Sequence, residues 1–201
     1  YGVFAMATAL IARIDTASLA AHQIVLNVAS VCFMVPLGVS SAGAVRVGQA
    51  MGRKDATGAA VSGWTAIGLG AAFMLCSSIT LFVVPDFVLR LFTTDRSIFA
   101  IGVPLLYLAA AFQFFDGVQV TAGGVLRGIG DTRTPMNANL IGHWLLGLPV
   151  GALLCFWLGW RSVGIWAGLS IGLIFVSVLL LSAWRKATQR MDAVIEAASH
   201  H

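Results

Sequence analysis

Charged residues are scarce in this sequence, and so are the motifs of soluble enzymes. Asp, Glu, Lys and Arg make up only 10% of the 201 residues, against about 25% in soluble domains. The glycines at 128 and 130 begin like a dinucleotide-binding loop, but the third glycine and a preceding strand are missing. There is no Walker A motif and no recognisable set of nucleophile, histidine and acid. We therefore expect neither an enzyme nor a cofactor.

Cysteine is also rare. The three cysteines, Cys32, Cys76 and Cys155, are far apart and lie within apolar segments. That spacing does not match a metal site, and it is typical of small buried apolar side chains.

Long apolar segments dominate what is present. Hydrophobic residues make up 59% of the chain, and its mean hydropathy is +0.91. Runs of about 20 apolar residues are long enough to cross a bilayer, so we expect an all-α membrane protein. The predicted spans are 19–45, 59–84, 99–125, 140–158 and 163–184, with a partial helix at 1–12.

The sequence also predicts where these helices begin, bend and end. Because 1–12 is too short to span, we expect the chain to begin partway through a helix and to be a fragment. Thr57 and Ser97 are predicted to start helices, and Pro36 and Pro149 to bend them. We divide the chain into a membrane lobe at 1–186 and a tail at 187–201.

Basic residues are distributed unequally between the two sets of span ends. Eight lie on one side and four on the other, and the cytoplasmic side of a membrane protein usually has the excess. This predicts a cytoplasmic C-terminus. The larger set is Arg46, Arg53, Lys54, Arg127, Arg133, Arg185, Lys186 and Arg190.

Asp116 is the one acidic residue well inside a predicted span. Burying a charged side chain at the bilayer centre costs about 2.5–3.5 kcal/mol even on a lenient scale. A carboxylate with no cation in its own span is expected to be protonated or to bind a cation. The alternative is a structural ion pair with Arg127 or Arg46.

Other polar residues recur at helical spacing. Gln113 and Gln119 lie three residues on either side of Asp116, so we expect a shared face. Gln23, Asn27 and Met34 form a stripe in the first span, while Asn139 and His143 form one in the fourth. Lipid disfavours such stripes, so they are expected to face the bundle interior. The alternative for Gln23, Asn27, Asn139 and His143 is interhelical hydrogen bonding. His22 and His143 could instead form a proton relay or be structural histidines.

Three glycines in the last span recur every four residues. Gly164, Gly168 and Gly172 are predicted to form a packing seam, because small residues allow membrane helices to approach closely.

Several segments, in order along the chain, resemble the C-terminal half of a multidrug and toxic compound extrusion (MATE) transporter of the NorM-like branch. They are Ala20-Ala-His-Gln-Ile24, Pro36-Leu-Gly-Val-Ser40, Val45-Arg-Val-Gly-Gln49, Phe112 to Gln119, Gly124 to Pro135, Gly147-Leu-Pro149 and Gly164-Ile-Trp-Ala-Gly168. The resemblance implies twelve helices in two six-helix lobes, of which this chain would be the second lobe.

The resemblance also implies a function. Members of this family exchange sodium ions or protons for organic, often cationic, compounds. Asp116 matches the acid on helix ten that takes part in cation coupling in the NorM-like branch. A second acid, on helix seven, would precede Tyr1. Phe112 stands where the branch's sodium site can use a tyrosine oxygen, and this difference favours protons while leaving Na⁺ at Asp116 open.

The resulting hypothesis is an antiporter that works by alternating access. Its partners would be an organic cation, membrane lipid and the N-terminal lobe of the same chain, and nucleic acid is not expected as a partner. Its location would be the bacterial inner membrane. Phe112, Met34 and Trp144 would offer apolar surface to a drug, or would simply pack. A lipid-linked saccharide flippase of the same superfamily is an alternative, although it would need more basic residues in its cavity. A non-transporting membrane scaffold is another.

Overall fold

Three aspartates begin three of the long helices in the computed structural model, which describes the backbone of residues 2–199 and the side chains of residues 2–191. α2 (Thr16–Gly52) follows Asp15, α3 (Ala56–Val83) follows Asp55, and α5 (Arg96–Gly128) follows Asp95. Their carboxylates accept hydrogen bonds from the backbone N–H groups of Ser18, Gly58 and Ser97 at 2.5, 2.8 and 2.9 Å. The predicted helix starts at Thr57 and Ser97 were wrong, because the capping carboxylates lie two residues earlier.

Long apolar helices account for most of the described chain. The five membrane-length segments are Thr16–Gly52, Ala56–Val83, Arg96–Gly128, Arg133–Phe156 and Arg161–Met191, which confirms the all-α membrane fold. A shorter helix, α1 (Gly2–Ile11), precedes them, and α4 (Pro85–Arg90) joins α3 to α5. The last helix, α8 (Arg161–Ser199), continues beyond its predicted end at Trp184.

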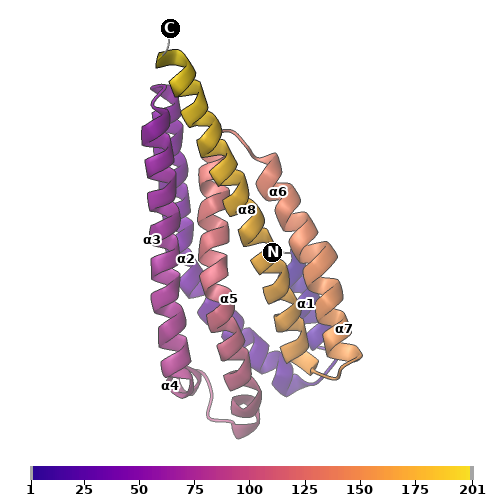
Figure 1. Cartoon of the computed structure of the whole chain (residues 1–201). Coiled ribbons are helices and arrows are strands. Elements are labelled where there is room, and N and C mark those ends of the chain that lie inside the picture. Colours follow the sequence, from indigo (N-terminus) through magenta and orange to yellow (C-terminus); the bar gives the residue numbers. More distant parts are fainter. Residues whose placement is uncertain (1, 200–201) are drawn as a thin grey trace.

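α5 lies at the centre of the bundle. It packs against α2, α3 and α8, and Figure 1 shows α8 in front of it with α1 and α2 behind. α3 forms one edge, and the segment from α6 to α7 forms the other. α2 contains Pro36 and changes direction along its length in Figure 1, as expected for a proline that removes a backbone hydrogen bond.

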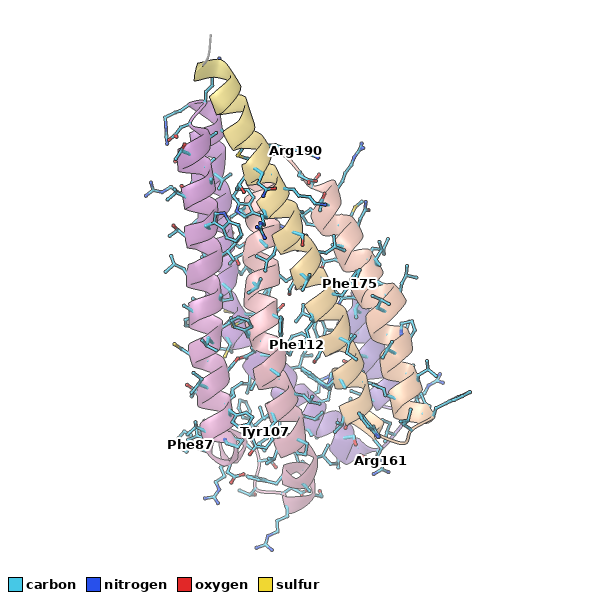
Figure 2. All side chains as sticks on the ribbon, in the orientation of Figure 1. Phe87, Tyr107, Phe112, Arg161, Phe175 and Arg190 are labelled. Carbon is cyan, nitrogen blue, oxygen red and sulfur yellow. The ribbon has the colours of Figure 1, made fainter. Side chains whose placement is uncertain are left out.

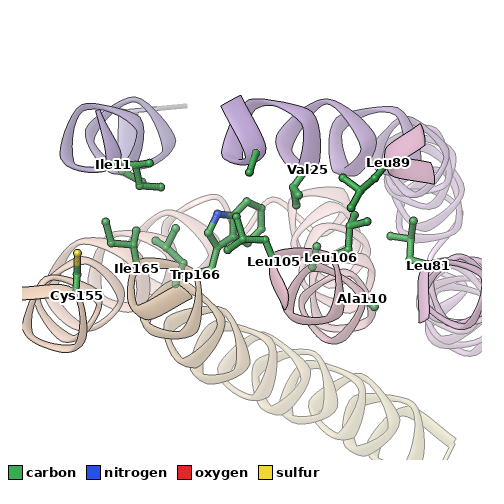
Figure 3. Close-up of a cluster of buried hydrophobic side chains, with 14 of the residues drawn as sticks. Ile11, Val25, Leu81, Leu89, Leu105, Leu106, Ala110, Cys155, Ile165 and Trp166 are labelled. Atoms are coloured by element: carbon green, nitrogen blue, oxygen red, sulfur yellow. The ribbon is translucent and has the colours of Figure 1, made fainter. Parts of the chain in front are cut away.

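Two apolar clusters fill the bundle, one toward each end. The first includes Ile11, Val25, Leu89, Leu105 and Trp166 (Figure 3). The second joins the other ends of α2, α3, α5 and α8 and includes Val47, Ala59, Val125, Leu180 and Trp184. α5 contributes residues 105–110 to the first cluster and 122–126 to the second. Its polar residues therefore lie between the two clusters.

The fourth membrane segment has a π-helix in its middle. It consists of α6 (Arg133–Asn139), the π-helix η1 (Leu140–Gly147) and α7 (Leu148–Phe156). Pro149 directly follows the wide turns. Because proline has no N–H and its ring clashes with the carbonyl four residues earlier, it disfavours regular α-helical bonding there.

The glycines of α8 form the predicted packing seam. A methyl group on Gly168 would overlap the backbone of Gly151, and one on Gly172 would overlap the Gly142 carbonyl. A methyl group on Gly164 would lie 2.7 Å from the Cys155 nitrogen. Backbone on both sides of the contact leaves no flexible side chain to move aside, so α8 approaches η1 and α7 this closely only with glycine.

The two ends of the bundle are also distinct. Figure 2 places Phe87, Tyr107 and Arg161 toward one end and Arg190 at the other, with Phe112 between them. Large hydrophobic side chains are exposed along the length, as expected for a surface in contact with lipid; they include Val31, Leu69, Phe82, Leu145 and Val178.

Candidate functional site

Asp116 lies on α5 between the two apolar clusters and is half-buried. Among the described side chains its carboxylate forms neither an ion pair nor a hydrogen bond. Arg127 instead donates to the Ser40 hydroxyl at 3.4 Å, and Arg46 is exposed. The structural ion pair considered from the sequence is therefore not formed in this arrangement.

The neighbours of Asp116 on α5 show which way this face points. Phe112 precedes Asp116 by four residues, and Gln119 and Gly123 follow it by three and seven. These spacings place all four residues on one face of the helix. The Phe112 ring packs edge-on against Phe4 of α1 and Trp166 of α8, with ring centroids 6.3 and 5.8 Å apart. Gly123 lies beside α6 and α8. Asp116 therefore faces α1, α6 and α8.

Phe112 itself is part of the protein interior. Its side chain is only 4% exposed, and the two aromatic contacts surround it. Of the two roles expected from the sequence, the structure supports packing for Phe112 rather than an open drug-contacting surface.

The two glutamines that flank Asp116 bind different neighbours. Ser77 of α3 donates to Gln113 Oε1 at 2.9 Å, whereas Gln119 Nε2 donates to Asn139 Oδ1 of α6 at 2.5 Å. The expectation that 113, 116 and 119 share one face was wrong. Each three-residue step falls about 60° short of a full turn, so residues six apart diverge by about 120°. Only Gln119 is directed to the Asp116 side.

Gln113 carries an unsatisfied group. It is fully buried, and its Nε2 is one of three buried side-chain nitrogens with no hydrogen-bond partner among the described residues; the others are His143 Nδ1 and Trp184 Nε1. Ser77 also approaches Cys32 Sγ at 3.1 Å. These contacts join α2, α3 and α5 through polar groups, in the manner of interhelical hydrogen bonding.

The polar stripe of α2 is on the surface of the lobe. Gln23, Asn27, Ser30 and Met34 are all exposed, Met34 by 70%. A polar surface is costly against lipid, so this face of α2 is suited to water or to another protein surface. It does not point into the interior of this lobe, as the stripe pattern alone had suggested.

His22 has a defined protonation state in this arrangement. Trp166 Nε1 donates to His22 Nδ1 at 3.0 Å. Because an indole nitrogen is only a donor, Nδ1 is the acceptor and the proton is on Nε2. Nε2 lies 2.9 Å from Thr8 Oγ1, which donates to the Phe4 carbonyl at 2.8 Å. His22 is therefore a neutral, fully bonded residue that ties α1 to α2 and α8.

The fourth membrane segment supplies the remaining candidates. Asn139 bonds both to Gln119 and, through Nδ2, to the Pro135 carbonyl at 2.8 Å. His143 is half-buried in η1. Trp144 is 42% exposed, and a methyl group on Gly2 of α1 would lie 3.2 Å from its ring. Sequence reasoning found these three residues but missed Thr8 and Trp166, which no local pattern links to His22.

Asp131 and Asp15, which lie outside the membrane segments, have well-defined partners. Hydrogen bonds from the side chain and backbone N–H of Thr134 lower the pKa of Asp131 below its ordinary value. Asp15 is similarly bonded to Ser18, and Arg161 lies 3.6 Å from its carboxylate, the one salt bridge among the described residues. Within those residues, no group of three or more His, Cys, Asp or Glu side chains converges as a metal site.

Comparison with known proteins agrees with this fold. The MatE family model matches residues 1–153. Probable multidrug resistance proteins NorM from Mesorhizobium japonicum and Brucella suis are 43% and 40% identical over 187 and 200 residues. These alignments cover 90% and 97% of this chain, but only 40% and 42% of the relatives. The chain therefore belongs to the MATE transporter family and spans about two fifths of the length of those relatives.

Solved structures show the same architecture. A eukaryotic MATE transporter superposes with a TM-score of 0.85 at 21% identity, covering 94% of this chain and 44% of that one. An outward-facing and an inward-facing structure of a multidrug resistance MATE family transporter match with TM-scores of 0.79 and 0.81, each at 18% identity. Each covers 89% of this chain, and this chain covers 39% and 41% of theirs.

Proposed function

We propose that the full-length protein containing this chain is a cation-coupled antiporter that exports organic, often cationic, drugs or toxins. The observation that carries the proposal is Asp116, the only acidic residue in the five membrane-length segments. Its carboxylate has no partner among the described side chains, so it is available to a proton or a sodium ion. The multidrug-resistance names of the relatives support the class of substrate.

Alternating access is the proposed mechanism. The exposed polar stripe of α2 would face the cleft and the N-terminal lobe of the same protein. This lobe fold matches outward-facing and inward-facing relatives almost equally well, which supports a lobe that moves as a unit. A cation at Asp116 would favour one arrangement and the drug the other, since each ligand must bind the two states unequally to shift the equilibrium.

The proposed coupling ion is the proton, with Na⁺ as the alternative. Phe112 contributes no oxygen ligand one turn before Asp116. Asn139 Oδ1 accepts a hydrogen bond from Gln119 Nε2, so a sodium ion would have to compete for the Asn139 oxygen. A proton needs only the carboxylate. We further propose a bacterial inner-membrane location with the C-terminus in the cytoplasm.

A lipid-linked saccharide flippase remains the second candidate, since it shares the superfamily. It would need cationic groups in the cleft to bind a diphosphate. Within the spans the expected candidates are His22 and His143, and His22 is committed to Trp166 and Thr8. A membrane scaffold would not need an unpaired carboxylate at this depth.

Transport by the full-length protein in vesicles tests the proposal. Uptake of a fluorescent organic cation should follow an imposed pH gradient, and a sodium gradient alone should drive it poorly. The reverse result would reassign the coupling ion while keeping the antiporter. No response to either gradient would overturn the antiporter itself.

A further inference from the structure

A groove runs between α3 and α8 near the end of the bundle that carries Arg190. In the interior next to it, the fully buried ring of Trp184 lies against Gly63 of α3, so closely that a methyl group on this glycine would overlap the ring. The next residue on each helix, Trp64 on α3 and Arg185 on α8, is exposed. The Gly63–Trp184 contact thus holds the helices together and leaves Trp64 and Arg185 on the outer side.

The groove has one basic end and an apolar length. Its volume is about 280 Å³, and it is lined by Trp64, Val178, Leu181, Ser182 and Arg185. Residues 178, 181, 182 and 185 occupy positions i, i+3, i+4 and i+7, which share one face of α8. Arg185 is nearest to the end of the membrane segment, and Val178 lies about two turns deeper.

Basic residues are concentrated near the groove. No Asp or Glu occurs in residues 132–191 or 56–83, which include the membrane segments of both groove helices. Lys186 and Arg190 are exposed near Arg185. In the part of the chain with described side chains, Arg185 has no carboxylate within ion-pair distance. The nearest acids along the two groove helices are Asp55, which caps α3, and Asp192, seven residues after Arg185 on α8. Along α8 the basic residues 186 and 190 are therefore closer to Arg185 in sequence than the acid is.

We propose that this groove binds an anionic phospholipid. The lipid phosphate would lie on the Arg185 guanidinium, and one acyl chain would run along Leu181 and Val178. Trp64 is suited to the boundary between them, because indole rings favour the level of the lipid headgroups. Basic pockets between membrane helices on the cytoplasmic side commonly bind anionic headgroups.

The position of the groove also favours lipid over a transported drug. The groove lies at the end of the bundle where α8 finishes, whereas α1 and the part of α2 with the exposed polar stripe, which is suited to the cleft, lie toward the other end (Figure 1). The outer side of the groove is bordered by exposed apolar residues such as Val61 and Ile174. The proposal depends on neither the drug nor the coupling ion.

Lipid retention by the purified full-length protein tests the site. The protein is reconstituted with phosphatidylglycerol or phosphatidylcholine, washed in detergent, and its bound lipid counted by native mass spectrometry. Arg185→Gln should reduce retained phosphatidylglycerol about fivefold, the factor expected for one basic residue at an anionic surface. Arg185→Lys should keep most of it. The matched control is Arg133→Gln, another exposed arginine at the same end but on α6, away from the groove.

Each outcome decides the proposal. The site is supported if Arg185→Gln is the only variant that retains less phosphatidylglycerol and its retention of phosphatidylcholine is unchanged. Equal loss in Arg133→Gln would mean general surface attraction and overturn it, as would full retention by Arg185→Gln. Equal retention of both lipids by the parent would show that the headgroup charge is not recognised and would also overturn it. A single symmetric peak in size-exclusion chromatography confirms that each variant is folded.

Discussion

Trp166 Nε1 donates a hydrogen bond to His22 Nδ1 at 3.0 Å, joining two helices whose residues are 144 positions apart. His22 in turn lies beside Thr8 of the short first helix. The Thr8–His22 contact is the one side-chain hydrogen bond between α1 and another helix among the described residues. The Trp166 bond, which fixes the His22 ring, should therefore matter for the position of α1.

Trp166→Phe should destabilise the full-length protein. The change keeps an aromatic ring but leaves the buried His22 Nδ1 without a donor, at a cost of about 1–3 kcal/mol. The thermal unfolding midpoint in detergent measures the loss. The control is Trp160→Phe, whose side chain is 50% exposed. If both variants lose the same stability, the His22 bond is not the cause.

Asp116→Asn should abolish coupled efflux while leaving membrane insertion and abundance normal. The amide keeps the shape of the side chain but cannot take up a proton or neutralise a cation. Drug binding should then no longer depend on pH or sodium, and Asp116→Glu should retain part of the transport.

The control for this experiment is Asp131→Asn in the polar turn before α6. Asp131 accepts a hydrogen bond from the Thr134 N–H at 3.0 Å, and an asparagine oxygen can replace it. Efflux of the fluorescent cation should therefore persist. Normal transport by Asp116→Asn together with loss in Asp131→Asn would mean that the other carboxylate couples transport.

Gly168→Ala should lower the unfolding midpoint, because the new methyl group meets the Gly151 backbone, which cannot rotate away. Overpacking of this kind typically costs about 1–3 kcal/mol. Gly68→Ala is the matched control: a methyl group there meets nothing within 4 Å, and alanine is the better helix former. The two substitutions should shift the midpoint in opposite directions, and a loss at both positions would contradict the seam.

Asp15 should make stability depend on pH in the acid range. Hydrogen bonds from Ser18, with a smaller contribution from Arg161, hold its pKa below the ordinary 3.8. A lowered folded-state pKa means that the contribution is complete above the ordinary value and is lost as the pH falls through the folded one. Asp15→Asn should therefore lower the unfolding midpoint at pH 7. The difference in unfolding midpoint between the variant and the parent should disappear below about pH 3.8. A difference that stays constant with pH would exclude the ionised carboxylate as its source.

Cysteine labelling should establish the orientation. In a protein whose native cysteines are replaced, Arg53→Cys and Thr94→Cys place exposed thiols in turns at opposite ends of the bundle. The excess of basic residues predicts that Arg53 is cytoplasmic and Thr94 is not. An impermeant reagent applied to intact cells should then label only the Thr94→Cys protein. If only the Arg53→Cys protein is labelled, the orientation in the membrane is the opposite of the one predicted.

The spans could be predicted because a bilayer requires long apolar runs, and length alone separates them from turns. The packing seam formed by the three glycines of α8 could also be predicted, since residues spaced four apart lie on one face of a helix. Asp116 stood out because a charged residue is rare at that depth.

The bonding of the polar residues could not be predicted in the same way. Gln113 and Gln119 fit a helical repeat in the sequence, but small angular errors add up over six residues and direct them to α3 and α6. His22 and Trp166 meet only through the packing of three helices. The exposed face of α2 depends on which neighbours surround it, and periodicity does not encode that.

The π-helix explains why the partner side of the glycine seam was not visible in the sequence. Gly142 and Gly147 are five residues apart, a spacing that would place them about 140° apart on an α-helix. In η1 both glycines nevertheless contact α8: Gly142 lies beside Gly172 and Gly147 beside Gly168. Deleting one residue between them would leave a spacing of four, which puts both on the same face of an ordinary α-helix. The fourth membrane segment thus behaves as a helix that has absorbed a single-residue insertion into one wide turn while its contacts with α8 continue on either side.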